Sequence, residues 1–166
     1  MYTVRVTQLE KFRRYMDSVS PFDTEQSVID TLSGEFKGNE YTWIGTAFHK
    51  IVEEGEKAWE NGIVRTGGGD VKMNESQKNV AMAYRNSMPE AFHETRLNKV
   101  FQTRFGEVNI SGCADIIHGN VIHDIKTKYS SPNQQEYIDS CQWRFYLEIF
   151  DANQFVFDLF HFMNYK

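Results

Sequence analysis

In the first half of the chain, apolar residues recur every three or four positions, which is the spacing of one face of a helix. The pattern predicts three helices, over about residues 23–32, 42–61 and 75–87. Thr7 and Glu10 have the spacing of a capping box and predict the start of a further helix. Gly34 is expected to end the first of the three, and Asn61 with Gly62 the second, because both residue types adopt the left-handed backbone that closes a helix.

The second half of the chain predicts a strand meander. Residues from about 94 to 128 are expected to form strands separated by turns near Gly106 and Gly119, followed by a helix over about 132–150. The last apolar run, 155–162, is apolar on both faces and therefore predicts a central strand covered on both sides. This order of elements predicts an α/β or α+β fold, with a mixed central β-sheet flanked by helices.

Length and composition favour one ordinary domain. The chain has 166 residues, of which 40% are hydrophobic, and it shows no repeat, no linker and no apolar run long enough to span a membrane. We therefore expect a single domain over 1–166 that has no membrane partner. The first residues lack the basic and then apolar order of a signal peptide, so a cytoplasmic location is expected.

Charge and cysteine content exclude several classes of protein. The net charge is −5, whereas a general nucleic-acid coat would be basic. Two cysteines, Cys113 and Cys141, are too few for a disulfide scaffold or for a four-cysteine metal or iron–sulfur site supplied by this chain alone. Both thiols are expected to be buried and reduced.

The sequence around Gly119 and Asn120 predicts a hairpin that brings two carboxylates together. If these two residues form the turn, counting outward places Asp115 directly opposite Asp124. Lys126 then lies two residues beyond Asp124, on the same face of the strand. A turn of another length would shift this register, and a slip of one residue would move one aspartate to the other face.

Carboxylates on neighbouring strands, about 5 Å apart, repel each other. The flanking isoleucines indicate a half-buried sheet, where water screens this repulsion poorly. Either one carboxyl group is protonated or a cation lies between them, and Mg²⁺ or Mn²⁺ fits best because these ions prefer oxygen ligands. Lys126 could then hold a bound phosphate or assist a water. The alternative is a solvated Asp and Lys on one face of an ordinary hairpin.

Two further pairs of residues favour a site. Gly45 and His49 lie one helical turn apart, so the missing side chain leaves a notch beside the imidazole for a ligand or a close strand. Gln142 and Tyr146, also four residues apart, present an amide and a phenol side by side. The alternatives are a core or surface histidine and an ordinary half-buried helix stripe. Glu53 could join the site, but its position also suits a solvated helix residue.

In this order, the motifs resemble those of the PD-(D/E)XK nuclease superfamily, nearest to its RecB-type exonuclease branch and the related CRISPR-associated nucleases. The resemblance covers about residues 42–146 and rests on four pieces: Gly45-x-x-x-His49, Gly112-x-x-Asp115, Asp124-Ile125-Lys126-Thr127 and Gln142-x-x-x-Tyr146. It implies a restriction-endonuclease-like α/β fold. It also implies a metal-dependent nuclease that hydrolyses DNA phosphodiester bonds, with exonuclease action expected.

The resemblance also implies roles for the motif residues. The metal, Mg²⁺ or Mn²⁺, would be held by His49, Asp115, Asp124 and the backbone carbonyl of Ile125. Lys126 would orient the attacking water or stabilise the transition state, so the expected catalytic residues are Asp115, Asp124 and Lys126. Gln142 and Tyr146 would contact the nucleic acid or support the site.

The chain departs from the family in several respects. Ala114 replaces the proline of the family's name, and the four cysteines that hold an iron–sulfur cluster in some relatives are absent. No helicase motor is present, so processive unwinding would need a helicase or recombination partner. Glu94 lies where relatives can carry an extra acidic residue, but we do not expect it to be a ligand.

Two other functions remain open. A catalytically silent relative would bind DNA or a protein partner through the same fold, although intact Asp115, Asp124 and Lys126 argue against it. A small interaction domain with accidental motifs would fit the acidic charge slightly better. The expected partner is a DNA substrate, single- or double-stranded, and it would need a local basic path. The candidates for that path are Lys11, Arg13, Arg14, Arg65, Lys72, Lys126 and Lys128.

Overall fold

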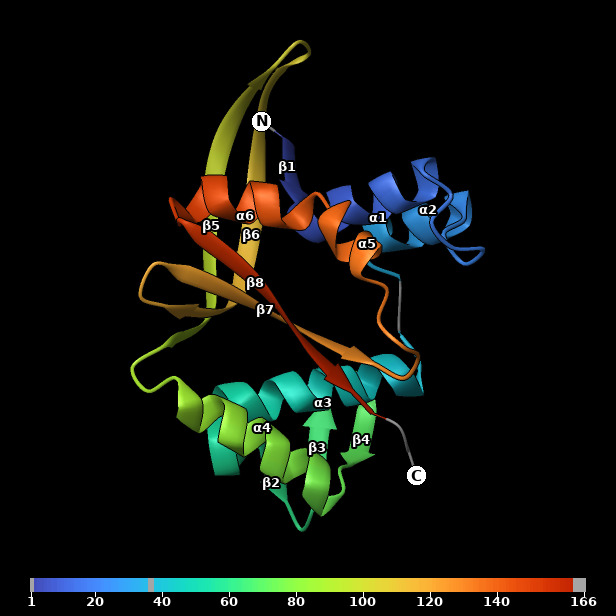
Figure 1. Ribbon diagram of the computed structural model, residues 1–166. Helices are drawn as coiled ribbons and strands as arrows, with labels where there is room; N and C mark the ends of the chain where they lie inside the picture. The colour runs from blue at the N-terminus through green and yellow to red at the C-terminus, as the bar shows by residue number, and fades with distance from the viewer. Residues whose placement is uncertain (1, 36–37, 163–166) are drawn as a thin grey trace.

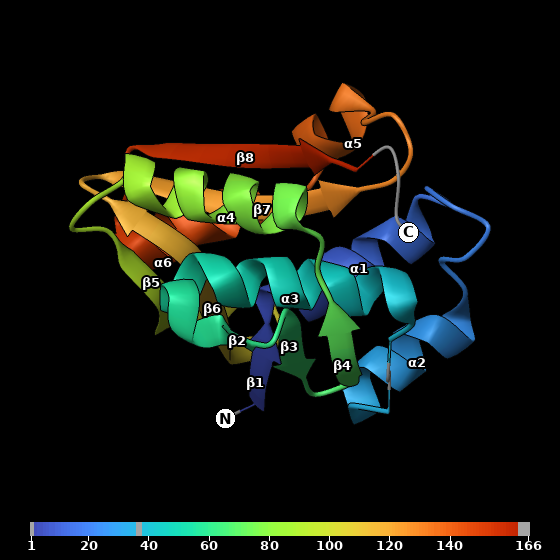
Figure 2. The same ribbon diagram turned by 90° about the horizontal axis from the view of Figure 1, so that it is seen from below.

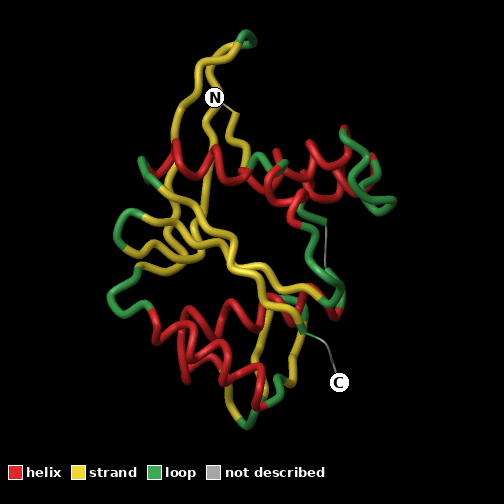
Figure 3. Tube along the Cα trace, viewed as in Figure 1, coloured by secondary structure: helices red, strands yellow, loops and turns green. Residues whose placement is uncertain are grey.

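The protein is described by a computed structural model that covers residues 2–35 and 38–162. The strands of its central sheet are β1 (Tyr2–Arg5), β5 (Phe92–Thr103), β6 (Gly106–His118), β7 (Val121–Lys128) and β8 (Gln154–His161). β5, β6 and β7 form an antiparallel meander, whereas β1 runs parallel to β6 and β8 runs parallel to β7 (Figure 1). β5 and β6 are the longest of these strands, and their hairpin extends beyond the helices (Figure 3).

Helices cover both faces of this sheet, as Figures 1 and 2 show together. One side carries α3 (Glu40–Glu54), the short 3-10 helix η1 (Gly55–Ala58) and α4 (Glu75–Ser87). The other side carries α1 (Val6–Met16), α2 (Glu25–Ser33), α5 (Gln134–Ile138) and α6 (Gln142–Phe150). The fold is therefore α/β with a mixed sheet flanked by helices, as the order of elements predicted.

Each face of the sheet has its own hydrophobic core. Phe48 and Ile51 of α3 are fully buried against Ile116 and Ile125 of the sheet, and α4 contributes Ala81. The second core gathers apolar residues of α1, β6, β7 and α6, namely Val6, Ile110, Ala114, Ile122, Tyr146 and Ile149. The sheet is thus clamped from both sides, which fixes the strands that carry the candidate site.

A small antiparallel sheet packs under α3 and was not predicted. It consists of β2 (Trp59–Glu60), β3 (Ile63–Thr66) and β4 (Gly69–Lys72). The predicted helix over 42–61 is correspondingly wrong in its second half, because α3 ends at Glu54. Asn61 and Gly62, both with positive φ, form the two-residue β2–β3 hairpin turn rather than a helix end.

Several other boundaries differ from the sequence expectation. The helix over 75–87 and the end of α2 at Gly34 are confirmed, with Gly34 in the left-handed conformation. The helix over 132–150 is divided into α5 and α6. The Thr7 capping box is wrong, because α1 begins at Val6 and Gln8 accepts the hydrogen bond of the Arg5 amide at 2.9 Å.

The last strand is at an edge of the sheet and not at its centre. β8 pairs with β7 on one side, and in Figure 2 no labelled strand lies beyond it. Both of its faces are apolar because each packs on a different core. Phe160 contacts Phe48 of α3, with ring centres 4.5 Å apart, whereas Phe155 contacts Tyr146 of α6. Coverage on two faces therefore does not require a central position.

None of the helices in the part of the chain that the structure describes is long and apolar enough to cross a membrane.

Candidate metal centre

The candidate site forms where β6 and β7 part. The three residue pairs nearest their turn are those that a two-residue turn predicts, and the pairing ends at Ile116 and His123. Within the described residues, the pairing thus stops one step before Asp115 and Asp124. Instead, Asp115 Oδ2 accepts a hydrogen bond from the Ile125 amide at 2.7 Å, so this carboxylate lies between the diverging strands.

Helix α3 places His49 beside the same strand. Gly45 permits the close approach, since a Cβ at that position would lie 2.8 Å from Thr127 Oγ1 of β7. His49 Nε2 donates to the carbonyl oxygen of Ile125 at 3.1 Å. Because a carbonyl oxygen can only accept, Nε2 carries a proton, and Nδ1 is the ring nitrogen that a neutral His49 would offer to an ion. His49 Nδ1 lies 3.7 Å from Asp115 Oδ2.

Strand β5 contributes a further carboxylate, Glu94. Its neighbours on β5 pair with the neighbours of Asp115 on β6, so Glu94 lies across from Asp115. The Glu94 backbone is left-handed, with φ of 45°, a conformation that costs a non-glycine residue about 1–3 kcal/mol. One ligand atom from each of His49, Glu94 and Asp115 lies within 4.8 Å of the other two. We call these three residues the candidate metal centre.

Asp124 and Lys126 form an ion pair next to this centre. Lys126 Nζ lies 2.6 Å from Asp124 Oδ2, and the Asp124 side chain is 8% exposed against 31% for Lys126. Asp124 Oδ2 is buried, and the charged ammonium group of Lys126 is its partner. The sequence correctly placed Asp124 and Lys126 on one face, but the structure leaves Asp124 outside the candidate metal centre.

Burial and neighbouring charges perturb these groups. Burial raises the pKa of Asp115 to about 6; His49 and Lys126 oppose the rise and Asp124 adds to it. Burial alone would lower the pKa of Lys126, but the charges of Asp124 and Asp115 outweigh it and raise that pKa. Lys126 is therefore a cation at neutral pH, and Asp115 is a carboxylate that gains from an added positive charge.

The residues of the centre fit a divalent ion. An imidazole nitrogen and two carboxylates suit Mn²⁺ or Mg²⁺, and a cation beside Asp115 would relieve the cost of its burial. Asp124 Oδ2, which lies 2.6 Å from Lys126 Nζ, is a further carboxylate oxygen beside the centre. The predicted ligands were His49, Asp115, Asp124 and the carbonyl of Ile125. The cluster in the structure contains Glu94 in addition to His49 and Asp115. The Ile125 carbonyl accepts a hydrogen bond from His49.

The centre opens into a groove between α3 and β7, with a volume of about 860 Å³. His49 and Glu94 line it together with the residues from Ile125 to Ser130 and the first turns of α3. The His49 and Asp115 side chains are 28% and 15% exposed, so solvent reaches both. We call this space the α3–β7 groove. It is wide enough to bring an extended substrate to the centre.

Gln142 and Tyr146 lie on the other side of the sheet. Tyr146 is 3% exposed, and its hydroxyl donates to the Cys113 carbonyl oxygen at 2.9 Å. Gly112 gives this ring room, since a Cβ there would lie 3.3 Å from it. Tyr146 therefore supports strand β6, which also carries Asp115. Gln142 is also buried, but it lines a small pocket shared with Lys126.

The candidate basic residues divide into two sets. Those of α1 are held by acids of the same region: Lys11 lies 2.7 Å from Asp23, and Arg13 pairs with Glu10 at 2.7 Å. Lys126 and Lys128 line the α3–β7 groove, although they too pair with acids, Asp124 at 2.6 Å and Glu136 at 3.5 Å. The local basic path is thus shorter than the sequence suggested.

The cysteines are free, as expected, but both are partly exposed instead of buried. Cys113 Sγ lies 3.4 Å from Glu94 Oε2, to which it donates, and burial raises the pKa of this thiol to about 11. Cys113 therefore remains a neutral donor to Glu94 at physiological pH.

The chain was compared with protein-family models, curated proteins and solved structures. No family model matches the chain, and no curated protein matches it. Among solved structures, the chain is similar to one described as "Crystal structure of SSO0001", with 16% sequence identity and a TM-score of 0.49. The similarity covers 96% of this chain and 62% of that one. This likeness identifies neither a family nor a function.

Proposed function

We propose that this protein is a metal-dependent nuclease that hydrolyses phosphodiester bonds of DNA, with exonuclease action as the expected mode. The observation that supports it most is the convergence of His49, Glu94 and Asp115 ligand atoms within 4.8 Å. These residues come from helix α3 and from the two strands of the β5–β6 hairpin, which follows α3 at a distance in the sequence. They meet beside a buried Asp–Lys pair at the wall of an open groove.

The chemistry follows from the donor set. A divalent ion in such a site offsets charge on the scissile phosphate and lowers the pKa of a water near neutrality. His49 is held by the Ile125 carbonyl with Nδ1 facing the centre, and Asp115 is held by the Ile125 amide. Both ligands are thus oriented before anything binds, which reduces the entropy lost on binding.

Lys126 is suited to a charge-stabilising role. Because Asp124 raises its pKa, Lys126 stays protonated at neutral pH and can hold a phosphate oxygen as negative charge develops in the transition state. Of the two roles that the family resemblance allows for the lysine, this favours stabilisation of the transition state. Asp124 would position Lys126 through their ion pair.

The test is digestion of end-labelled single- and double-stranded DNA with Mn²⁺, Mg²⁺ or EDTA. We expect ion-dependent shortening by the wild-type chain and its loss in Glu94→Gln and Asp115→Asn. Glu53→Gln is the matched control. Glu53 belongs to α3 and lies close enough to Glu94 of β5 for their charges to interact, but it is outside the candidate metal centre. Equal digestion by Glu94→Gln and wild type would remove Glu94 from the site.

The same experiment separates the alternative functions. A catalytically silent relative would bind Mn²⁺ in calorimetry and bind DNA, but would leave every substrate intact. An interaction domain with accidental motifs would show neither ion binding nor digestion.

A further inference from the structure

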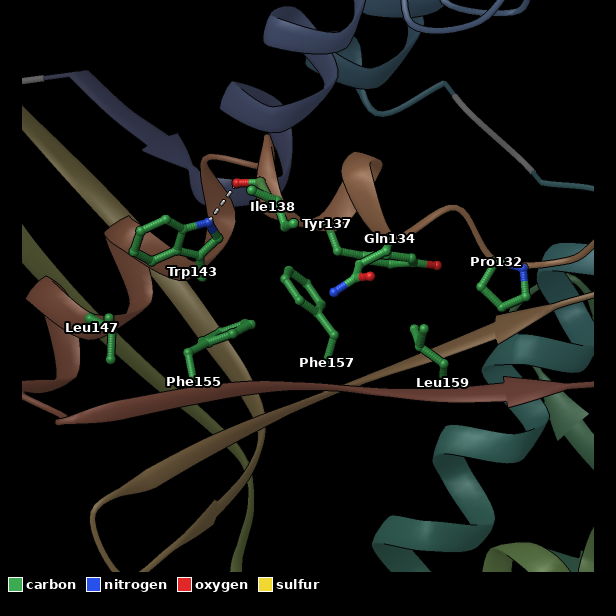
Figure 4. A pocket seen from close by; sticks show the side chains of 9 residues that line it. All are labelled: Pro132, Gln134, Tyr137, Ile138, Trp143, Leu147, Phe155, Phe157 and Leu159. Carbon is green, nitrogen blue, oxygen red and sulfur yellow. Dashed lines mark hydrogen bonds between the residues drawn. The ribbon is translucent and has the colours of Figure 1, made fainter.

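A second groove, on the α5–α6 side of the sheet, is lined by aromatic rings. Figure 4 shows Phe155, Phe157 and Leu159 rising from β8 toward Tyr137 of α5 and Trp143 of α6. The groove has a volume of about 640 Å³, and we call it the aromatic groove. Its rings are half-buried and open to solvent on one side, whereas the core aromatic Phe48 is fully buried. Such rings offer faces that a ligand can cover.

The aromatic groove and the α3–β7 groove lie on opposite sides of the sheet and are linked through residues of strand β7. A small pocket of about 210 Å³ shares Lys126 and Lys128 with the α3–β7 groove, and shares Tyr137 and Phe157 with the aromatic groove. Gln142, which belongs to one of the sequence motifs, lines this connecting pocket. Two lysines of β7 therefore border both the α3–β7 groove and the pocket that adjoins the aromatic rings.

Three cations, Arg14, Lys126 and Lys128, line the connecting pocket against two acids, Glu10 and Glu136, so its charges slightly favour an anionic occupant. Lys128 Nζ lies 5.7 Å from the centre of the Tyr137 ring, and Arg144 lies 4.9 Å from that of Trp143. Glu136 is the acid nearest to Lys128, but their separation of 3.5 Å is that of a loose pair that a phosphate can displace. The Tyr137 hydroxyl is buried and has no hydrogen-bond partner among the described residues, so a donor is also available.

We propose that the aromatic groove binds the unpaired bases of a single-stranded nucleic acid, whose phosphates follow Lys126 and Lys128 from the candidate metal centre. This inference rests on the proposed function and names its substrate form. Alternating cations and aromatic rings suit a strand with a phosphate backbone and flat bases. A duplex keeps its bases stacked inside, so they do not reach these rings; an apolar peptide would leave the lysines without a role.

The proposal is tested by binding of fluorescein-labelled twelve-residue oligothymidylate in EDTA, followed by fluorescence anisotropy. Tyr137→Leu keeps the groove apolar but removes a stacking surface, and we expect it to weaken binding about 5- to 100-fold. The matched control is Phe105→Leu, an exposed aromatic at the tip of the β5–β6 hairpin, which should bind like wild type. Binding should also quench tryptophan fluorescence, and Trp143→Phe should remove most of that quenching.

A second variant, Ile138→Glu, tests the same groove in case Tyr137→Leu does not fold. Ile138 is 52% exposed at the rim of the aromatic groove, so Ile138→Glu should fold normally and repel the strand. The proposal is overturned if Tyr137→Leu, or Ile138→Glu where the first does not fold, binds as tightly as wild type. It is also overturned if the oligonucleotide does not bind, or if the groove is covered by a second copy, seen as a dimer that Ile138→Glu dissociates.

Failure of this proposal differs from failure of the nuclease assignment. If wild type digests DNA with Mn²⁺ and both groove variants bind and digest equally well, the nuclease stands and the aromatic groove has no role in binding. If the groove variants lose binding but no chain digests DNA, the strand path stands and the nuclease assignment falls.

Discussion

Asp115→Asn should stabilise the protein while it destroys the candidate metal centre. Asparagine keeps the shape of the side chain and an oxygen that accepts from the Ile125 amide, but it removes a buried negative charge. A pKa raised from 3.8 to about 6 corresponds to about 3 kcal/mol of disfavoured ionisation. Because neighbouring charges readjust, we expect a gain of about 1–3 kcal/mol in the free energy of unfolding at pH 7.5.

The gain should depend on pH in one direction. Folded Asp115 holds its proton up to about pH 6, whereas the unfolded chain releases it near 3.8. Between these values the folded state binds more protons, so wild-type stability contributed by this group falls as pH rises. The advantage of Asp115→Asn should therefore be small at pH 4, grow up to about pH 6 and then level off.

Urea denaturation in EDTA at several pH values measures this difference. Added Mn²⁺ should reverse the order, since an ion at 1,000 times its dissociation constant stabilises wild type by about 4.1 kcal/mol but binds the variant poorly. The reasoning is refuted if Asp115→Asn is less stable than wild type at pH 7.5 in EDTA, or if its advantage is the same at pH 4 and pH 7.5.

Three further predictions follow from contacts of the site. Gly45→Ala places a Cβ 2.8 Å from Thr127 Oγ1 and should lower the free energy of unfolding in urea by about 1–3 kcal/mol; adding Thr127→Ala should restore most of it, and no rescue would contradict the proposed contact. Tyr146→Phe loses the hydrogen bond to Cys113 and should cost about 1 kcal/mol of unfolding free energy without changing DNA affinity in anisotropy. Lys126→Met should keep Mn²⁺ binding in calorimetry but reduce cleavage about 100-fold or more; cleavage at the wild-type rate would disprove its role.

Local patterns predicted much of the fold because they act over short distances. Helical spacing found α4, and the turn at Gly119 and Asn120 fixed three residue pairs of β6 and β7. The pattern failed where distant packing decides. Asn61 and Gly62 suit both a helix end and a hairpin turn, and packing of the small sheet under α3 selects the hairpin. The edge position of β8 likewise depends on the arrangement of whole elements.

In the candidate site, too, the sequence predicted what depends on local spacing and missed what depends on the arrangement of distant elements. Gly45 and His49 lie together because a helix fixes their spacing, and the close strand at Gly45 matches one of the two expected uses of its notch. Glu94 was set aside although a signal existed: a two-residue turn at Arg104 and Phe105 puts it across from Asp115. The left-handed backbone that turns Glu94 into the centre is invisible to side-chain patterns.

The hold that Ile125 has on two ligands comes from its main chain. Its amide fixes Asp115 and its carbonyl fixes His49, while its side chain is buried in the core. A mutation can delete either ligand, but at position 125 only proline would remove a main-chain contact, namely the amide that holds Asp115, and the carbonyl that holds His49 would remain. Valine or leucine there would disturb the packing and still present the same two atoms. Most substitutions at position 125 would therefore retain the backbone amide and carbonyl that orient Asp115 and His49.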